Sequence, residues 1–469
     1  MSRLASRFVC AGCGAEPDPR QTPFRCPNAG RDDDVDHVLR RRLDLSAVRF
    51  PVGDPEPNPF LRYRGLLHAY HLAVEGGLLD DVFCTLVRRL DEAVASVDGH
   101  GFTATPYARS AELSDALGFS DAGGVWVKDE TGNVSGSHKA RHLFGVLVYL
   151  EVAELLGLAE ADRHPELAIA SCGNAALAAA VVAAVGGRAL RVFVPSGADP
   201  VVLGRLEELG ARITVCPRDG LAGDPAYRRL LEALAGGALP FTCQGNLNGL
   251  AVEGGETLGY EIVSELAAAG TTLDRLVVQV GGGALASACI HAFREAVELG
   301  VLAASPRIDT VQTEGAWPLK RAFDAVETRG NVEEALGYAA HHRSAFMWPW
   351  EEEPRSIAHG ILDDETYDWL AVVEGMLATG GRPFVAGEDT LVQANAVAQE
   401  TTGIDVDPTG SAGLAGLLAL RAAGEVGDDE RVAVLFTGVT RRSSSERKER
   451  SDEKLSRPRH SVAQGLRAR

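Results

Sequence analysis

The feature that most constrains this chain is a repeated pattern of a short apolar strand, a turn rich in glycine or small polar residues, and a segment with helical spacing. The apolar runs that fit the strand position are 125–127, 167–170, 190–194, 212–216, 276–280, 308–312 and 432–436. Most are followed by a turn and a helical pattern, which is typical of parallel βαβ units. The sequence therefore predicts an α/β fold with parallel-rich twisted sheets flanked by helices.

The length and charge of the chain narrow its organisation and its partners. At 469 residues the chain exceeds what one compact core holds, so we expect two α/β domains with smaller attached segments. Its formal net charge of −19 opposes binding to a phosphate backbone, because nucleic-acid affinity comes largely from Lys and Arg. We therefore expect no nucleic-acid partner.

Signals for secretion or membrane insertion are missing from the sequence. The first residues contain no apolar core of signal-peptide length, and the apolar run 175–185 is roughly half the ~20 residues that a membrane span needs. We expect a cytoplasmic protein without membrane contact. Its 8 cysteines then stay reduced, so their spacing bears on metal or redox chemistry and not on disulfides.

One of the turns places a lysine at the start of a predicted helix. The segment VWVKDETGNVSGSHKARHLFGV combines a strand, a glycine-containing turn and Lys139 at a helix N-terminus. The positive end of the helix dipole favours the amine form of such a lysine and attracts anions. This placement suits a lysine that bonds covalently to a carbonyl compound, whereas spacing alone fits a solvated lysine in a first helical turn better.

Two further turns resemble anion-binding loops. Ser171–Asn174 lie between a strand and a helix, where they either offer donors to an anion or form an ordinary loop with Asn174 as the helix N-cap. Gly281, Gly282 and Gly283 follow a strand and precede a helix, so the backbone can wrap an anion with no Cβ atom in the way. Their spacing is neither GxGxxG nor GxxxxGK[ST], which disfavours dinucleotide or nucleoside-triphosphate binding.

In chain order, these segments resemble the tryptophan-synthase-β-like superfamily, the fold type II pyridoxal-phosphate enzymes. The matching stretches are KDETGNVSGSHKAR, ASCGNAALA, NLNGLAVEGGETLGYEI, VQVGGGALAS, VQTEG, DPTGSAGLAGL and VLFTG. Within this superfamily the chain is most similar to threonine synthases and serine/threonine dehydratases. The resemblance implies a two-domain fold with pyridoxal 5′-phosphate wedged between the domains and an amino acid as the small-molecule substrate.

The resemblance also implies roles for individual residues. Lys139 matches the lysine that carries the cofactor, Asn174 the asparagine that hydrogen-bonds the ring oxygen, and Thr437 a hydroxyl that faces the pyridine nitrogen. The phosphate-binding loop of the family matches Gly281, Gly282, Gly283, Ala284 and Leu285. The loop that begins at Ser171 matches the binder of the substrate carboxylate.

Two departures from the family pattern lie in the implied substrate site. His138 and Ala140 flank the lysine where the family usually has an aromatic and an acidic residue. His138 either contacts the substrate or fills the aromatic position, and we favour the second role. Cys172, beside Gly173, replaces the threonine of family threonine synthases, where it would face the site, although a buried small hydrophobe is the commoner role of a free cysteine.

The implied hydroxyl at Thr437 bears on the reaction. A neutral hydroxyl cannot keep the ring nitrogen protonated, so the cofactor is a weaker electron sink and elimination is favoured over transamination or racemisation. We expect β- or γ-elimination, or elimination followed by replacement, by a threonine-synthase-like lyase. The first alternative is a serine/threonine dehydratase that releases a keto acid, favoured by SIAHG at 356–360. The second is a non-catalytic protein that binds the cofactor or an amino acid.

The N-terminal cysteines resemble a degenerate zinc-ribbon-like knuckle. Cys10 and Cys13 form a CxxC pair, but Cys26 begins CPNAG where the resemblance implies CPxCG, so an alanine replaces the fourth thiolate. Tetrahedral structural zinc takes four ligands. His37 or one of the aspartates 32–34 can substitute, but we expect a knuckle held by packing, with no bound metal.

These observations divide the chain into four parts. We expect a small module at 1–45, a large α/β domain from 46–134 and 251–440, a smaller mobile α/β domain at 135–250, and a disordered tail at 441–469. The tail has ten Lys and Arg against four Asp and Glu and few apolar residues. The oligomeric state stays open, a homodimer included.

Overall fold

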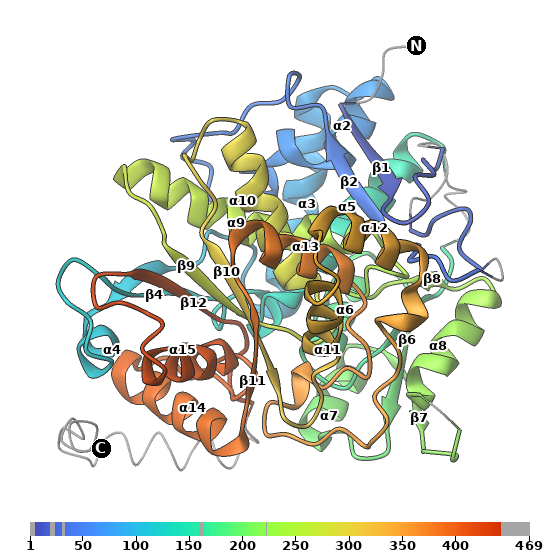
Figure 1. Cartoon of the computed structure of the whole chain (residues 1–469). Coiled ribbons are helices and arrows are strands. Elements are labelled where there is room, and N and C mark those ends of the chain that lie inside the picture. Colours follow the sequence, from blue (N-terminus) through green and yellow to red (C-terminus); the bar gives the residue numbers. More distant parts are fainter. Residues whose placement is uncertain (1–4, 19–23, 31–32, 159–163, 222, 442–469) are drawn as a thin grey trace, which may run out of the picture.

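A computed structural model describes residues 5–18, 24–30, 33–158, 164–221 and 223–441, and Figure 1 shows their path. Every predicted strand is present, and each one pairs in parallel with at least one neighbour. The predicted α/β class is therefore confirmed. The predicted tail lies outside the described residues except for Arg441, and Asp32 of the predicted metal candidates lies outside them too.

The larger sheet has six strands in the order β11-β10-β9-β12-β4-β3. Their bounds are β3 Tyr107–Ser110, β4 Gly124–Asp129, β9 Arg275–Gln279, β10 Arg307–Thr313, β11 Pro383–Ala386 and β12 Arg431–Phe436. All neighbours are parallel except β3, which pairs antiparallel with β4 at the edge. Because β9, β12 and β4 are adjacent and parallel, the loops at their carboxyl ends meet at one edge of the sheet, where α/β proteins bind ligands.

The smaller sheet has four parallel strands in the order β7-β6-β5-β8. Their bounds are β5 Leu167–Ala170, β6 Leu190–Pro195, β7 Arg212–Cys216 and β8 Leu239–Pro240. The two sheets lie on opposite sides of the molecule in the view of Figure 1. All strands of the smaller sheet fall within 135–250 and all strands of the larger sheet fall outside that range, whereas the domain boundaries themselves stay a prediction.

The helices surround and separate the sheets. They are α1 Pro59–Arg62, α2 His68–Glu75, α3 Asp80–Asp98, α4 Ala111–Ala116, α5 Lys139–Leu155, α6 Asn174–Val185, α7 Pro200–Glu208, α8 Pro225–Ala235, α9 Leu250–Ala269, α10 Ala284–Glu298, α11 Pro318–Glu327, α12 Val332–His341, α13 Trp369–Thr379, α14 Glu388–Thr402 and α15 Ala412–Ala422. Short 3₁₀ turns are η1 Arg64–Leu66, η2 Val134–Gly136, η3 Arg343–Ala345 and η4 His359–Ile361.

Helices α5 and α9 form the buried centre of the molecule, and their sequences explain why they can do so. A Cβ atom on Gly145 of α5 would lie 3.0 Å from the Cα atom of Gly254 in α9. Glycine at both positions therefore lets the two backbones approach closely. This contact joins the helix that begins at Lys139 to α9.

The N-terminal module is a two-stranded antiparallel hairpin, β1 Ser6–Cys10 and β2 Leu39–Leu43, that docks on α9. Arg41 of β2 is buried, and its guanidinium pairs with Glu256 of α9 and lies 3.0 Å from the carboxylate of Glu295 in α10. A buried guanidinium needs such a partner, because an unpaired charge in the interior is costly. The module is thus anchored to the core through charge as well as apolar contact.

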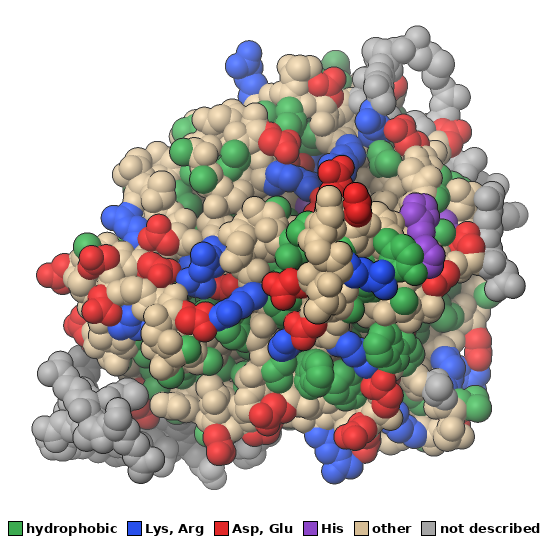
Figure 2. All heavy atoms as spheres, viewed as in Figure 1, with side chains coloured by type: hydrophobic (Ala, Val, Ile, Leu, Met, Phe, Trp, Pro, Cys, Tyr) green, Lys and Arg blue, Asp and Glu red, His purple; other side chains and the backbone are tan. Residues whose placement is uncertain are grey.

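The helices and the surface bear on membrane contact and on charge. Among the described residues, no helix combines the length and the apolar character that a membrane crossing requires. On the face seen in Figure 2, Lys and Arg side chains are interspersed with Asp and Glu and form no continuous basic patch.

Candidate active site

Lys139 is the first residue of α5, and the segment before it is tied to the segment after β12. The amide of His138 donates to the carbonyl oxygen of Thr437 at 3.2 Å. The amide of Val439 donates to the carbonyl oxygen of Gly136 at 3.0 Å. Two predicted site residues, Lys139 and Thr437, are therefore brought together by backbone hydrogen bonds across the chain.

The amine of Lys139 is available for chemistry. Its side chain is half-buried and, within the described residues, makes no hydrogen bond or ion pair. Burial raises the pKa of Asp363 to about 6 and that of Asp368 to about 7, and the nearby Lys139 charge acts against both shifts. A lysine amine without a partner in such an enclosed place can bond to a carbonyl group.

A buried ion network fixes the first turn of α5. Arg141 Nε lies 2.8 Å from Glu130, and its Nη1 lies 2.7 Å from Glu261 of α9. Burial by itself would raise the pKa of Glu261, but Arg141 and Lys128 overcome this effect and lower it to about 2. Because the network joins β4, α5 and α9, it fixes the backbone of the first turn of α5, from which the Lys139 side chain projects.

Thr437 follows β12, and its hydroxyl is oriented by Gln279 at the end of β9. Gln279 Nε2 donates to Thr437 Oγ1 at 2.8 Å and to the carbonyl oxygen of Gly410 at 2.7 Å. Because Oγ1 accepts this bond, the hydroxyl hydrogen of Thr437 can be donated to another acceptor. Gln279 was not among the predicted site residues, although its position at the strand end before Gly281–Gly283, the glycine turn, could have suggested it.

Asn174 is the first residue of α6 and is held from both sides. The helix N-cap is Gly173, so the alternative role of Asn174 as N-cap is wrong. Asn174 Oδ1 accepts a hydrogen bond from Arg441 Nη2 at 2.7 Å, and the Asn174 side chain also bonds to Asp407. Arg441 in turn donates to the carbonyl oxygen of Ser135 at 2.8 Å, close to Lys139 in the chain.

The glycine turn binds an anionic oxygen of the chain itself. Gly283 has a φ of 97°, which favours glycine. A Cβ atom on Gly281 would lie 2.3 Å from Asp363 Oδ2, and the amide of Gly282 donates to the same carboxylate. The backbone donors of this turn therefore suit an anion, and Asp363 is a functional candidate that was not predicted.

Other predicted residues complete this edge. Ala284 and Leu285 are the first residues of α10, and both are buried. Ser171 and Cys172 are half-buried in the turn after β5, where the amide of Gly173 donates to Ser171 Oγ at 3.4 Å.

Cys172 connects this turn with the glycine turn. Burial raises the pKa of the Cys172 thiol, and the nearby carboxylates of Asp224 and Asp363 raise it further. Since Asp363 also contacts the glycine turn, the two predicted anion-binding turns lie near the same carboxylate.

His138 is buried, and its ring contacts the segment after β12. Its Nδ1 donates to the carbonyl oxygen of Thr437 at 3.2 Å, and within the described residues Nε2 has no hydrogen-bond partner. Burial, and then the charge of Lys139, lower the pKa of His138 well below its usual value. The imidazole is therefore neutral, as expected of a residue that fills space and positions its neighbour.

The residues at this edge fit a cofactor with a phosphate, a ring and a carbonyl carbon. The glycine turn offers amides to the phosphate, Asn174 and Thr437 offer polar atoms, and Lys139 offers an amine. A family model described as "Pyridoxal-phosphate dependent enzyme" matches residues 100–438.

The chain belongs to this family. The predicted cofactor, pyridoxal phosphate, and the predicted superfamily are thus confirmed. Threonine synthase from Methanocaldococcus jannaschii is 26% identical over 337 residues, which cover 71% of this pyridoxal-phosphate enzyme and 74% of the relative.

Solved structures share its fold. Maize serine racemase matches with a TM-score of 0.55 at 16% identity, over 79% of this chain and 98% of that chain. A fungal L-serine ammonia-lyase from Rhizomucor miehei matches with a TM-score of 0.54 at 19% identity, over 75% of this chain and 98% of that chain.

Proposed function

We propose that this pyridoxal-phosphate enzyme catalyses elimination, or elimination followed by replacement, at the β or γ carbon of an amino acid. The observation that carries the proposal is the Lys139 amine, which has no partner within the described residues and lies at a helix N-terminus tied to Thr437. The similarity to threonine synthase supports the same reaction class.

Each candidate site residue has a distinct proposed role. Gly281–Gly283 would hold the cofactor phosphate, Asn174 its ring oxygen, and Thr437 its ring nitrogen. Lys139 would hold the cofactor, which when bound would supply an electron sink for the substrate Cα. The Lys139 amine, once free, would act as the base that removes the Cα proton. The turn after β5, which begins at Ser171, would bind the substrate carboxylate.

The polar character of Thr437 supports elimination. Gln279 Nε2 already donates to its oxygen, so the hydroxyl can donate its own hydrogen to an unprotonated ring nitrogen. A neutral partner leaves the ring a weak electron sink. Prompt departure of a leaving group then competes well with reactions that need a long-lived carbanion.

Acidic residues near the site favour a dehydratase as the second candidate. Asp363 and Asp364 both have pKa values raised to about 6, chiefly by burial, and the charge of Asp224 contributes to both shifts. The charges of Asp224 and Asp363 also act on Cys172 in the proposed substrate loop. At neutral pH they would repel a phosphorylated substrate side chain there, whereas a neutral hydroxyl group meets no such repulsion. A hydroxy amino acid is therefore the better match to this part of the site.

Product analysis separates the candidates. We would incubate the holoenzyme with phosphohomoserine, serine and threonine in turn and follow phosphate, ammonia and keto acid together. A keto acid and ammonia from serine or threonine identify a dehydratase, whereas threonine and phosphate from phosphohomoserine identify a synthase. No product from any of them, with the cofactor bound, would favour the non-catalytic alternative.

Lys139→Ala tests the lysine assignment. We expect the folded variant to lose the visible absorption of lysine-bound cofactor and all turnover, because no other residue supplies the amine. Lys320→Ala, which removes a lysine from α11, is the matched control and should keep both. Borohydride should attach the cofactor to the Lys139 peptide, and attachment to another lysine would overturn the assignment.

A further inference from the structure

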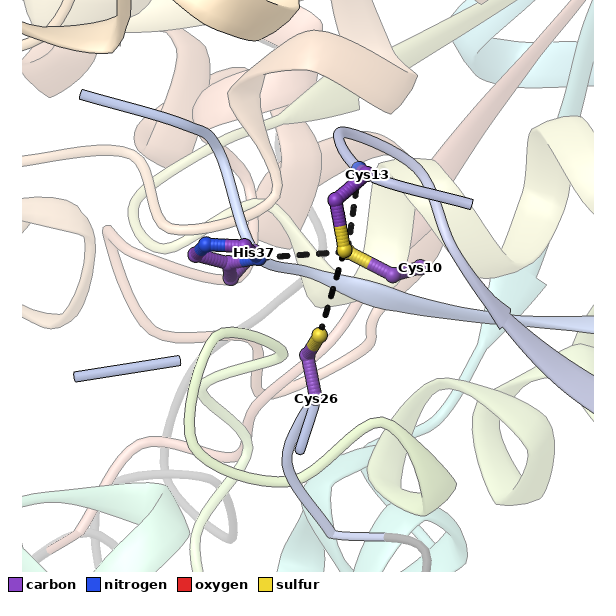
Figure 3. Close-up of side chains that lie close together, drawn as sticks. All are labelled: Cys10, Cys13, Cys26 and His37. Carbon is purple, nitrogen blue, oxygen red and sulfur yellow. Dashed lines mark hydrogen bonds between the residues drawn. The ribbon is translucent and has the colours of Figure 1, made fainter. Parts of the chain in front are cut away.

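Four metal-binding side chains meet in the N-terminal module, at a place where the sequence predicts no bound metal. Cys10, Cys13, Cys26 and His37 each offer one ligand atom, and these atoms lie within 4.8 Å of one another (Figure 3). Cys10 Sγ lies 3.5 Å from His37 Nδ1. Cys13 Sγ lies 3.5 Å from Cys26 Sγ.

These separations are those of a tetrahedral site. Zinc bonds of about 2.3 Å to sulfur and about 2.0 Å to nitrogen put two sulfurs about 3.8 Å apart and a sulfur and a nitrogen about 3.5 Å apart. We propose that the three cysteines and His37 bind one structural zinc ion. On binding, each thiol loses its proton to solvent, and neutral His37 coordinates through Nδ1.

A surrounding shell of hydrogen bonds supports the proposal independently. His37 Nε2 lies 3.1 Å from Asp33 Oδ1, and this contact fixes the ring so that Nδ1 points to the cysteines. The backbone amide of Asn28 donates to Cys26 Sγ, and its side-chain amide donates to Cys13 Sγ, both at 3.3 Å. Carboxylate-bound histidine and amide-bound sulfur are the usual outer contacts of metal ligands.

The site is closed, which indicates a structural role. Cys10 is 2% exposed and Cys26 is 3% exposed, and the His37 side chain is 9% exposed. Four protein ligands leave no open position for a substrate or a water molecule. His37 replaces the missing fourth thiolate, because the chain leading into β2 returns beside the CxxC turn.

The metal would stabilise the contact between the N-terminal module and the rest of the protein. The carbonyl oxygen of Phe24, two residues before Cys26, accepts a hydrogen bond from the amide of Gly249 at 2.9 Å, at the start of α9. Asp36, next to His37, accepts a hydrogen bond from Trp369 Nε1 at 3.2 Å. Both contacts are made by residues beside the proposed ligands.

The second contact leads to the glycine turn. The amide of Asp368, the residue before Trp369, donates to the carbonyl oxygen of Gly282 at 3.0 Å. Zinc would therefore stabilise the module and, through it, one wall of the cofactor site. Loss of zinc should lower the melting temperature of the holoenzyme. Turnover measured well below that temperature should change little.

Metal analysis of the purified holoenzyme tests the proposal. We expect about one zinc per chain in wild-type protein and at least about a fivefold loss in Cys13→Ser and His37→Ala, which each remove one of four ligands. Cys84→Ser is the matched control, because Cys84 is a buried free cysteine of α3 outside the cluster, and its zinc content should match the wild type. The visible absorption of the cofactor shows whether each variant is folded.

A second measurement covers variants that fail to fold. Wild-type enzyme stripped of metal and given Co²⁺ should develop the absorption of tetrahedral thiolate-bound cobalt at wavelengths beyond the cofactor band, and Zn²⁺ should abolish it. Zinc below about a fifth of an equivalent in protein from zinc-supplemented cells, no cobalt band, or a Cys13–Cys26 disulfide in its place would each overturn the proposal.

Discussion

Asp363 occupies the turn that we propose for the cofactor phosphate. It lies against Gly281 and accepts a hydrogen bond from the Gly282 amide, one of the proposed phosphate donors. The carboxylate and the phosphate are both anions, so they cannot share these donors without repulsion. Burial raises the pKa of Asp363 to about 6, so the side chain can become neutral within a physiological pH range.

We predict that Asp363→Asn binds pyridoxal phosphate about tenfold more tightly than the wild type at pH 8, a change equal to about 1.4 kcal/mol. Below pH 6 the wild-type carboxyl is itself protonated, so the two affinities should converge at pH 5. Cofactor titration at both pH values measures the ratio, in which the protonation of the free cofactor cancels.

Asp364→Asn is the matched control for this experiment. It removes the same charge one residue away, where the pKa is also raised to about 6, without removing the carboxylate that accepts from Gly282. Its effect should be smaller. If Asp363→Asn binds the cofactor no more tightly than the wild type at pH 8, the Asp363 carboxylate does not compete with the cofactor phosphate.

The connection from β9 to α10 depends on a glycine whose backbone conformation disfavours any side chain. Gly283 has a φ of 97°, and a Cβ atom there would lie 3.1 Å from both Asp368 Cβ and Thr366 Cγ2. A side chain at this position therefore strains the backbone and also meets its neighbours. The helix N-terminus behind the turn adds its dipole to the amides that face an anion.

We predict that Gly283→Ala weakens cofactor binding about tenfold, because holding an L-residue in the left-handed region costs roughly 1–2 kcal/mol, and an alanine that leaves this region moves the amides of the turn. Gly300→Ala is the matched control at the other end of α10, with a φ of 71° and open space around it. It should lose similar stability and keep its cofactor affinity. Equal cofactor loss in both variants would assign the effect to general destabilisation.

Whole-molecule stability depends on the buried network that joins β4 of the larger sheet to α5 and α9. Glu261 is 3% exposed and bonds to Arg141 and Lys128. Its pKa in the folded protein is about 2, below the ordinary value of 4.5. A lowered carboxyl pKa contributes stability that is complete above pH 4.5 and is lost as the pH falls toward 2.

We predict that Glu261→Gln lowers the free energy of unfolding by about 3–5 kcal/mol at pH 7, because it leaves buried cations without their partner. The difference from the wild type should shrink as the pH falls below 4.5. Urea unfolding at several pH values measures it, with Glu265→Gln on the exposed side of α9 as the control. A difference independent of pH would show that lost packing, not charge, causes the effect.

The predicted strands are confirmed, and the strand-to-helix turns that hold the candidate site residues could be located, because their signals are local. Each strand is a short apolar run beside a turn, and Lys139, Asn174 and the glycine turn each lie at a strand-to-helix junction that one segment of sequence displays. Strands β3, β8 and β11 were not predicted; β11 is apolar, but it has four residues and begins with a proline, which is a weak strand signal.

Contacts between distant segments required the tertiary structure. No local pattern marks the contact of Arg441 with Asn174 or that of Asp363 with the glycine turn. The sequence offers His37 only as one of several candidates, and packing brings it to the CxxC turn. Local patterning follows from backbone geometry and burial within one element. Which polar side chain meets which depends on how the elements pack, because only packing excludes water and forces each buried polar group to find a partner.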